Sequence, residues 1–122
     1  MAFNDTVMIL ANSPRNEGKL EGASHTGTMG VPGEGRYIRI HLIVEAGTIK
    51  AASFESNGCP ASIASASLVC QLVCGKPVEN ARQIGGKDVI VILRGLPEGK
   101  APMADMAVSA LNEALETPVP QD

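Results

Sequence analysis

The chain has 122 residues, of which 44% are hydrophobic and 19% charged, so we expect residues 1–122 to form a single domain with one hydrophobic core. A formal net charge of −3, with no basic stretch interleaved with aromatic residues, argues against nucleic acid as a partner. No apolar run is long enough to span a bilayer and the N-terminal segment lacks a signal-peptide pattern, so we expect a cytoplasmic protein without membrane contact.

Two elements are predicted before residue 36. Asn4 and Asp5 can cap a short helix that runs through Leu10, because their side-chain oxygens accept the unpaired N–H groups of a first helical turn. Residues 17–35 are rich in Gly, Ser, Thr and Pro, which is typical of a loop, and residues 23–29 within them suit an edge strand.

A β-hairpin is the clearest pattern in the chain. Along residues 37–45, the apolar side chains Ile38, Ile40, Leu42 and Val44 alternate with the others, which predicts a strand with one buried face. Ala46 and Gly47 then form a tight turn, and residues 48–56 run back as a second strand.

Two helices have clear boundaries in the second half. Residues 61–74 are rich in Ala and Leu, follow Pro60 at the expected first helical position and stop before a Gly-Lys-Pro sequence. A second helix is predicted from residues 101–103 to about Glu116. Between them, residues 78–84 suit a helical turn, whereas residues 89–93 indicate a strand by propensity alone.

Cys59 is the first candidate for chemistry. It lies where a strand leads into a helix, and the unpaired N–H groups and helix dipole there stabilise a thiolate, which favours a metal ligand or a nucleophile. A buried cysteine that only fills space is an equally good interpretation of its position. The count of three cysteines is odd, and in a reducing compartment thiols are better explained as ligands or core residues than as disulfides.

The other thiols and imidazoles are weaker candidates. Cys70 and Cys74 lie four residues apart on one helix face, and we expect both to be packed, so Cys59 should be alkylated faster than either. His25 in the Gly-rich loop and His41 on the polar side of its strand are expected to be solvated. No sequence motif assembles a nucleophile, a base and an oxyanion hole, so we expect no enzyme activity.

Together these segments resemble the U-type scaffolds of iron–sulfur cluster assembly, the family that includes the N-terminal domain of the nitrogen-fixation scaffold. The matching segments are residues 13–18 (SPRNEG), 44–50 (VEAGTIK), 54–59 (FESNGC), 61–67 (ASIASAS) and 95–100 (GLPEGK). The resemblance implies an α+β fold with an N-terminal helix, a small antiparallel three-stranded sheet, and a helical C-terminal half packed on one face of that sheet. It also implies that residues 89–93 are helical.

The family's metal ligands are mostly replaced in this chain. Family members hold their metal with three cysteines, helped by an Asp and a His, and only the middle cysteine, Cys59, matches. Aligned without gaps, the first cysteine falls on Glu34, the Asp on Arg36, and the His-Cys pair on Pro102 and Met103. Cys59 is therefore the metal-binding residue that the resemblance supports, with Glu34 and Met103 as weaker candidates.

Two hypotheses about function follow from the resemblance. In the first, the chain is a scaffold-like protein with a reduced metal site that binds iron or a labile iron–sulfur cluster through Cys59, shared with a second copy in a homodimer. In the second, it is a regulatory or adaptor paralogue with no metal of its own, which binds cluster-assembly partners such as a cysteine desulfurase.

Overall fold

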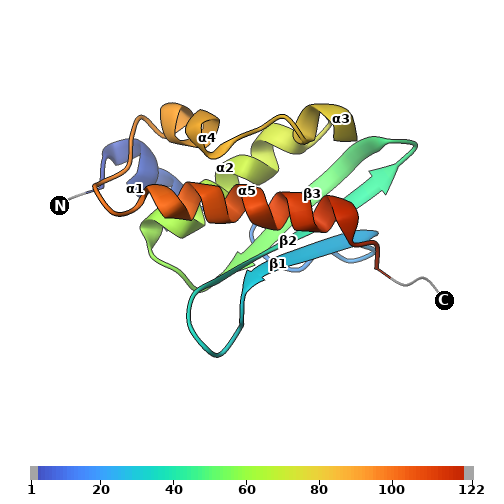
Figure 1. Cartoon of the computed structure of the whole chain (residues 1–122), viewed down its shortest axis with the longest axis horizontal. Coiled ribbons are helices and arrows are strands. Elements are labelled where there is room, and N and C mark those ends of the chain that lie inside the picture. Colours follow the sequence, from blue (N-terminus) through green and yellow to red (C-terminus); the bar gives the residue numbers. More distant parts are fainter. Residues whose placement is uncertain (1–2, 120–122) are drawn as a thin grey trace.

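The computed structural model describes residues 3–119 and places the helices on one side of a small sheet. The elements in chain order are α1 (Asp5–Asn12), β1 (His25–Gly30), β2 (Tyr37–Glu45), β3 (Thr48–Ser56), α2 (Pro60–Val73), α3 (Val78–Ala81), α4 (Gly86–Ile92) and α5 (Ala101–Glu116). The three strands form an antiparallel sheet in the order β1-β2-β3, and α2 and α5 lie against it (Figure 1). The expected α+β architecture is confirmed. Within residues 3–119, no helix is long and apolar enough to cross a membrane.

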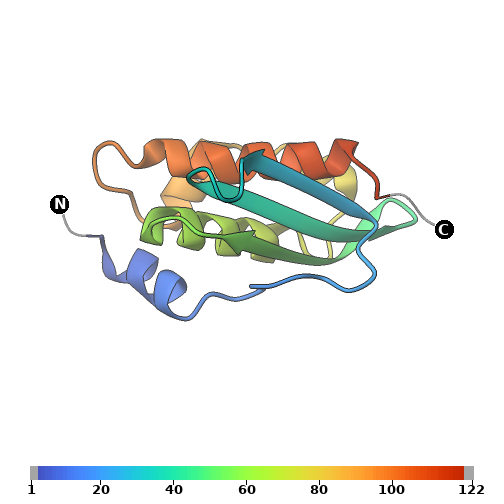
Figure 2. The ribbon, with the colours of Figure 1, turned by 90° about the horizontal axis from the view of Figure 1, so that it is seen from below.

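The β2–β3 hairpin forms as its alternation predicts. Ile38, Ile40 and Leu42 are fully buried on the face of the sheet that the helices cover, and Figure 2 looks onto the opposite face. The turn residues Ala46 and Gly47 both have positive φ angles, 51° and 78°, which suit the right-handed twist of a two-residue hairpin. A register shift between Ile43 and Val44 interrupts the strict alternation near the turn.

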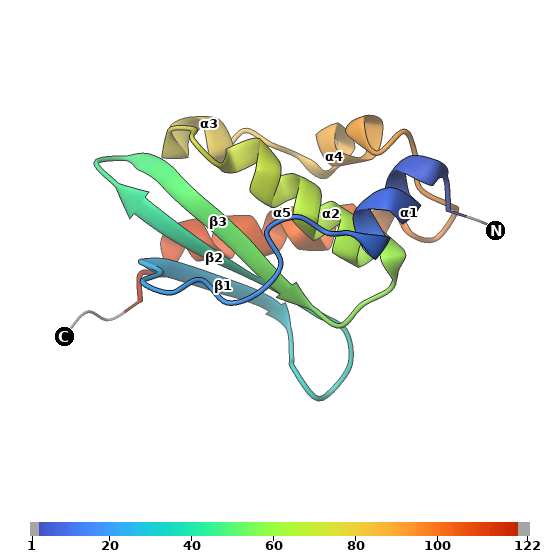
Figure 3. The same cartoon turned by 180° about the vertical axis from the view of Figure 1, so that it is seen from behind.

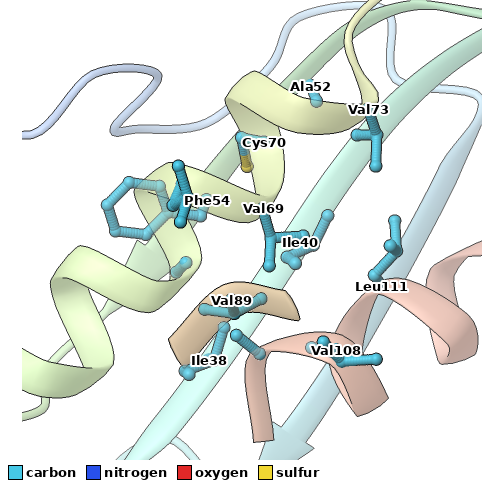
Figure 4. Close-up of a cluster of buried hydrophobic side chains, with 14 of the residues drawn as sticks. Ile38, Ile40, Ala52, Phe54, Val69, Cys70, Val73, Val89, Val108 and Leu111 are labelled. Atoms are coloured by element: carbon cyan, nitrogen blue, oxygen red, sulfur yellow. The ribbon is translucent and has the colours of Figure 1, made fainter. Parts of the chain in front are cut away.

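Helix α2 is the central element of the core. Its small Ala and Ser residues are buried almost all around the helix, so the sheet, α1 and α5 can approach it closely. Figure 4 shows Cys70 of this helix beside Phe54 and Val69, and its side chain is fully buried as expected. Pro60 occupies the first helical turn, which confirms the predicted start of the helix.

Residues 89–93, which their propensity alone assigns to a strand, belong largely to α4. Val89 and Leu93 lie four residues apart and are both fully buried, so one helical face carries them into the core. The carboxylate of Asp88 accepts a hydrogen bond from the backbone N–H of Gly85 at 2.9 Å and caps the first turn. The expectation from propensity was wrong, because tertiary burial outweighs it, and the one from the family resemblance is confirmed.

Asn4 joins the first helix to the second half of the chain. Its Oδ1 accepts a hydrogen bond from the N–H of Val7 at 2.9 Å and caps α1, as predicted. Its Nδ2 donates to the carbonyl oxygens of Leu93, Arg94 and Gly95 at 3.0–3.1 Å, just beyond the end of α4. Helix α1 continues to Asn12, two residues beyond the predicted end. This docking holds α1 beside α2, as Figure 3 shows.

Candidate functional site

Cys59 lies at the point where three segments of the chain meet. It is the residue before α2, with an extended backbone (φ −73°, ψ 173°), so its side chain stands at the N-terminal end of that helix. The first turn of α5 and the loop between β1 and β2 lie at the same end of the molecule (Figures 1 and 3). The predicted position of Cys59 at a helix start is confirmed.

The surroundings of Cys59 stabilise its thiolate. Partial burial alone raises the pKa of the thiol, but hydrogen bonds from the Ser62 backbone, the Ser62 hydroxyl and the Ala61 backbone, with the positive charge of Lys100, outweigh it and lower the pKa overall. The Ser62 hydroxyl lies 3.8 Å from Cys59 Sγ and 2.9 Å from the carbonyl oxygen of Cys59, and its single proton can be donated to either acceptor. The result is a half-buried thiol that ionises more readily than a free cysteine.

Neighbouring residues fix the loop that carries Cys59. The side chain of Asn57 accepts a hydrogen bond from the N–H of Tyr37 at 3.0 Å and donates to the carbonyl oxygen of Gly35 at 2.8 Å, so it joins this loop to the β1–β2 loop. Gly58 has no room for a side chain, because an added Cβ would lie 1.8 Å from Ser62 Oγ. The backbone before Cys59 is therefore fixed by the hydrogen bonds of Asn57 on one side and by the close packing of Gly58 against Ser62 on the other.

Arg36 and Met103, which replace an acid and a cysteine of the family pattern, are in contact. Arg36 Nη1 lies 3.6 Å from Met103 Sδ and donates a weak hydrogen bond to it. The N–H of Met103 bonds to the carbonyl oxygen of Lys100 at 3.0 Å, so Met103 and Lys100 share the first turn of α5. The sulfur that could serve as a second soft ligand thus faces a guanidinium, whose positive charge opposes a metal ion at that place.

Glu34 lies apart from these contacts. It is exposed in a turn of the β1–β2 loop, where its N–H donates to the carbonyl oxygen of Val31 at 3.0 Å. Within residues 3–119, its carboxylate makes no hydrogen bond or ion pair, and no three His, Cys, Asp or Glu side chains are close enough together to hold a metal ion. The structure therefore joins Arg36 to Met103 and brings Lys100 to Cys59, but it does not join Glu34 to either pair.

The expectation that both Cys70 and Cys74 are packed holds for only one of them. Burial, with the adjacent Cys74, raises the pKa of the Cys70 thiol to about 12, so this thiol is inert at neutral pH. Cys74 is exposed, because α2 ends at Val73 and the chain turns away there. Its accessibility removes one reason to expect slower alkylation of Cys74 than of Cys59.

The expectation that both histidines are solvated was wrong. His41 is only 9% exposed: its Nε2 lies 2.7 Å from Glu55 Oε1 and its Nδ1 lies 3.1 Å from Thr26 Oγ1, because neighbours on the adjacent strands cover the ring. His25 is the first residue of β1 and is half-buried, with Nδ1 2.9 Å from Ser24 Oγ. Within residues 3–119, no hydrogen bond or ion pair joins either histidine to Cys59, so neither adds to the candidate site.

Sequence reasoning did not identify Ser62 and Lys100 as site residues. Ser62 carries a local signal, since a Ser hydroxyl can donate to the carbonyl oxygen three residues before it, here that of Cys59. Lys100 carries none, because it reaches Cys59 only through the packing of α5 against α2.

The lowered pKa of Cys59 predicts how its reactivity depends on pH. In a Cys74→Ser background, alkylation of Cys59 should follow a titration whose midpoint lies below that of an unstructured peptide cysteine, because its thiolate persists to lower pH. Ser62→Ala should move the midpoint upward by removing one stabilising hydrogen bond. The rate of iodoacetamide labelling against pH, with sites mapped by mass spectrometry, measures both. A midpoint at or above that of the peptide would contradict this description of the site. Ser67→Ala, a Ser-to-Ala change elsewhere on α2, is the matched control and should leave the midpoint of Cys59 unchanged.

Comparison with known families gives a match over nearly the whole chain. The model of the family described as "NifU-like N terminal domain" matches residues 2–117. The chain is 34% identical over 113 residues to the iron–sulfur cluster assembly scaffold protein IscU 1 of Archaeoglobus fulgidus, covering 93% of this chain and 74% of that protein. It is also 34% identical over 119 residues to the scaffold protein IscU of Azotobacter vinelandii, covering 94% and 92% of the two chains.

Solved structures share the fold at low sequence identity. A putative iron–sulfur cluster assembly scaffold protein for the SUF system from Fervidobacterium islandicum superposes with a TM-score of 0.76 at 17% identity, over 93% of this chain and 96% of the other. The N-terminal part of a nitrogen-fixing NifU-like protein from Brucella abortus gives a TM-score of 0.71 at 16% identity, over 93% and 92%.

Proposed function

The chain belongs to the family of NifU-like N-terminal domains, and on that premise we propose that it serves iron–sulfur cluster assembly as a scaffold that offers one thiolate, Cys59, per chain. The observation that carries the proposal is the environment of Cys59. The thiol is half-buried at a helix start, its pKa is lowered, and it occupies the one family cysteine position that this chain retains.

One chain does not offer enough ligands to hold a cluster or a zinc ion. A tetrahedral metal site needs four donors, and thiolates supply charge and softness together. Beside the Cys59 thiolate this chain has the thioether of Met103, which already faces Arg36, and the exposed carboxylate of Glu34. The residues present therefore fit a site that is shared between molecules rather than one completed within a chain.

In the shared arrangement, the cluster is cargo bridged by two chains. Each chain contributes Cys59, whose proton leaves as the sulfur binds iron, and external thiols fill the remaining positions on the irons. Ser62 and Lys100 favour the ionised form of Cys59 and so prepare it for this step. The bound cluster would remain labile, which suits a scaffold that must release it.

Anaerobic reconstitution with ferrous iron, sulfide and an external thiol tests the proposal. The parent should develop the visible absorption of an iron–sulfur cluster, and Cys59→Ser should lose it. Cys70→Ser and Cys74→Ser are matched controls and should retain it, since Cys70 is buried in the core and Cys74 lies at the far end of α2. Retention of the cluster by Cys59→Ser would refute the role of Cys59 and direct attention to Cys74.

The contact between Arg36 and Met103 favours a second candidate function. Because it places a cation where the family has an acid, the chain would act as an adaptor that binds a cysteine desulfurase or another assembly protein without carrying metal. This candidate predicts that the parent stays free of metal after anaerobic purification and that Cys59→Ser binds the desulfurase as tightly as the parent. A pull-down with purified desulfurase, together with iron and sulfide analysis, distinguishes it from the scaffold.

A further inference from the structure

Helix α4 exposes two large apolar side chains that the fold of a single chain does not use. Val91 is 75% exposed and Ile92 is 46% exposed, while the core-facing side of the same helix is already formed by Val89 and Leu93. The exposed side of a surface helix normally carries polar residues. Two adjacent exposed β-branched residues therefore suggest that another surface covers them.

A hollow lies directly beside Ile92. It has a volume of about 360 Å³, its apolar wall consists of Leu72, Ala81, Ile84 and Ile92, and it opens to solvent between α2, α3 and α4. Figure 1 shows α4 on the outer side of the helical layer, away from the sheet. One face of the molecule thus offers both a projecting apolar residue, Val91, and an apolar hollow next to it.

We propose that this face is the contact surface between two copies of the chain, which pack α4 antiparallel against α4 about a two-fold axis near Val91. A two-fold interface must be complementary to itself, because each copy presents the same patch. In this arrangement Val91 of each copy packs against Ile92 of the other at the mouth of the hollow. The face is self-complementary, because the projecting Val91 of one copy can enter the hollow beside Ile92 of the other.

The charges at the ends of α4 select the second copy as the occupant. Asp88 lies in the first turn of the helix, and Arg94 follows its last turn. Within residues 3–119, neither side chain has an ion-pair partner. Antiparallel packing about Val91 places Asp88 of each copy opposite Arg94 of the other, so the two ends of the interface become paired. A parallel arrangement would bring like charges together, which disfavours it.

This dimer is independent of the proposed function. A dimer bridged by a cluster depends on metal and on Cys59, whereas the α4 contact requires neither. Sedimentation in the presence of a chelator should therefore show a dimer for the parent and for Cys59→Ser alike. A dimer that disappears in both conditions would support bridging through Cys59 and overturn the α4 interface, and a chain that is monomeric at every concentration would overturn it as well.

Substitutions on α4 locate the interface. Val91→Glu should raise the dimer dissociation constant about a hundredfold, because two Val side chains, one per copy, lose their burial and two carboxylates face an apolar surface. Ile9→Glu on α1 is the matched control, since Ile9 is 67% exposed on another helix, and it should leave the constant unchanged. An equal effect of both substitutions, or none from Val91→Glu in a folded protein, would contradict the proposal.

Charge reversal and crosslinking test the antiparallel orientation. Arg94→Glu should weaken the dimer about tenfold, while Arg15→Glu, the same change at an exposed residue elsewhere, should not. In a background with Cys59→Ser and Cys74→Ser, Val91→Cys should be joined between copies by a short bis-maleimide, whereas Ile9→Cys should not. Efficient crosslinking at residue 9, or none at residue 91 in a dimeric protein, would overturn the arrangement.

Discussion

A variant that carries Glu34→Cys, Arg36→Asp, Pro102→His and Met103→Cys is expected to bind zinc at least a thousandfold more tightly than the parent. A complete shell of thiolates, with imidazole or carboxylate, holds Zn²⁺ by roughly 10–16 kcal/mol in small structural sites, and a gain of only about 4 kcal/mol amounts to a thousandfold change. The contact between Arg36 and Met103 already places two of the four positions together. Competition with a chromophoric chelator measures the dissociation constant.

The control for this variant is the same four substitutions with Cys59→Ser. It should lose most of the gained affinity, because one of three thiolates is then missing. A folded fourfold variant that binds zinc no better than the parent would show that these positions do not converge on Cys59. The alignment that places these four positions around Cys59 would then be wrong for this chain.

The second large effect is expected at Gly27, where β1 meets α5. A Cβ added there would lie 2.1 Å from the backbone nitrogen of Ala114 and 2.6 Å from the carbonyl oxygen of Ala110. The clash is with backbone atoms, so β1 and α5 would have to separate. Gly27→Ala should therefore lower the free energy of unfolding by about 3 kcal/mol, at the upper end of the usual cost of overpacking.

Urea unfolding followed by circular dichroism measures this change. Thr28→Ala, the next residue on β1, is the matched control and should cost less than about 1 kcal/mol. Adding Ala114→Gly to Gly27→Ala should not restore stability, because removing the methyl group of Ala114 leaves its backbone nitrogen in place. Full rescue by that second substitution would mean that the helix and strand contact each other through side chains instead.

The parts of the fold that are encoded locally could be predicted from the sequence. The alternation along β2, the turn at Ala46 and Gly47, and Pro60 at the start of α2 each depend on a few neighbouring residues, and the structure agrees with all three. Residues 89–93 could not be assigned this way. Their Val and Ile content suits a strand, and only the burial of Val89 and Leu93 together makes the helix the better solution.

In the candidate site, too, the features set by neighbouring residues could be predicted and those set by tertiary packing could not. The lowered pKa of Cys59 could be anticipated from its place before a helix, since helix starts stabilise anions wherever they occur. The approach of Lys100 and the contact between Arg36 and Met103 depend on how distant segments pack, and single-sequence patterns do not contain that information. The exposure of Cys74 was missed because the helix ends one residue earlier than its composition suggests.

Native mass spectrometry of the anaerobically reconstituted Val91→Glu variant tests the central claim most directly, because it counts chains per cluster in a protein whose metal-independent α4 contact is weakened. Since the site at Cys59 offers one strong soft ligand per chain, every species that carries a cluster there should contain two chains. Treatment with a chelator should release the cluster and leave no cluster-bearing monomer. Cys59→Ser should give no such species. A single chain that retains a cluster or a zinc ion after gel filtration with chelator would contradict the claim, because Cys59 would then have ligands within its own chain.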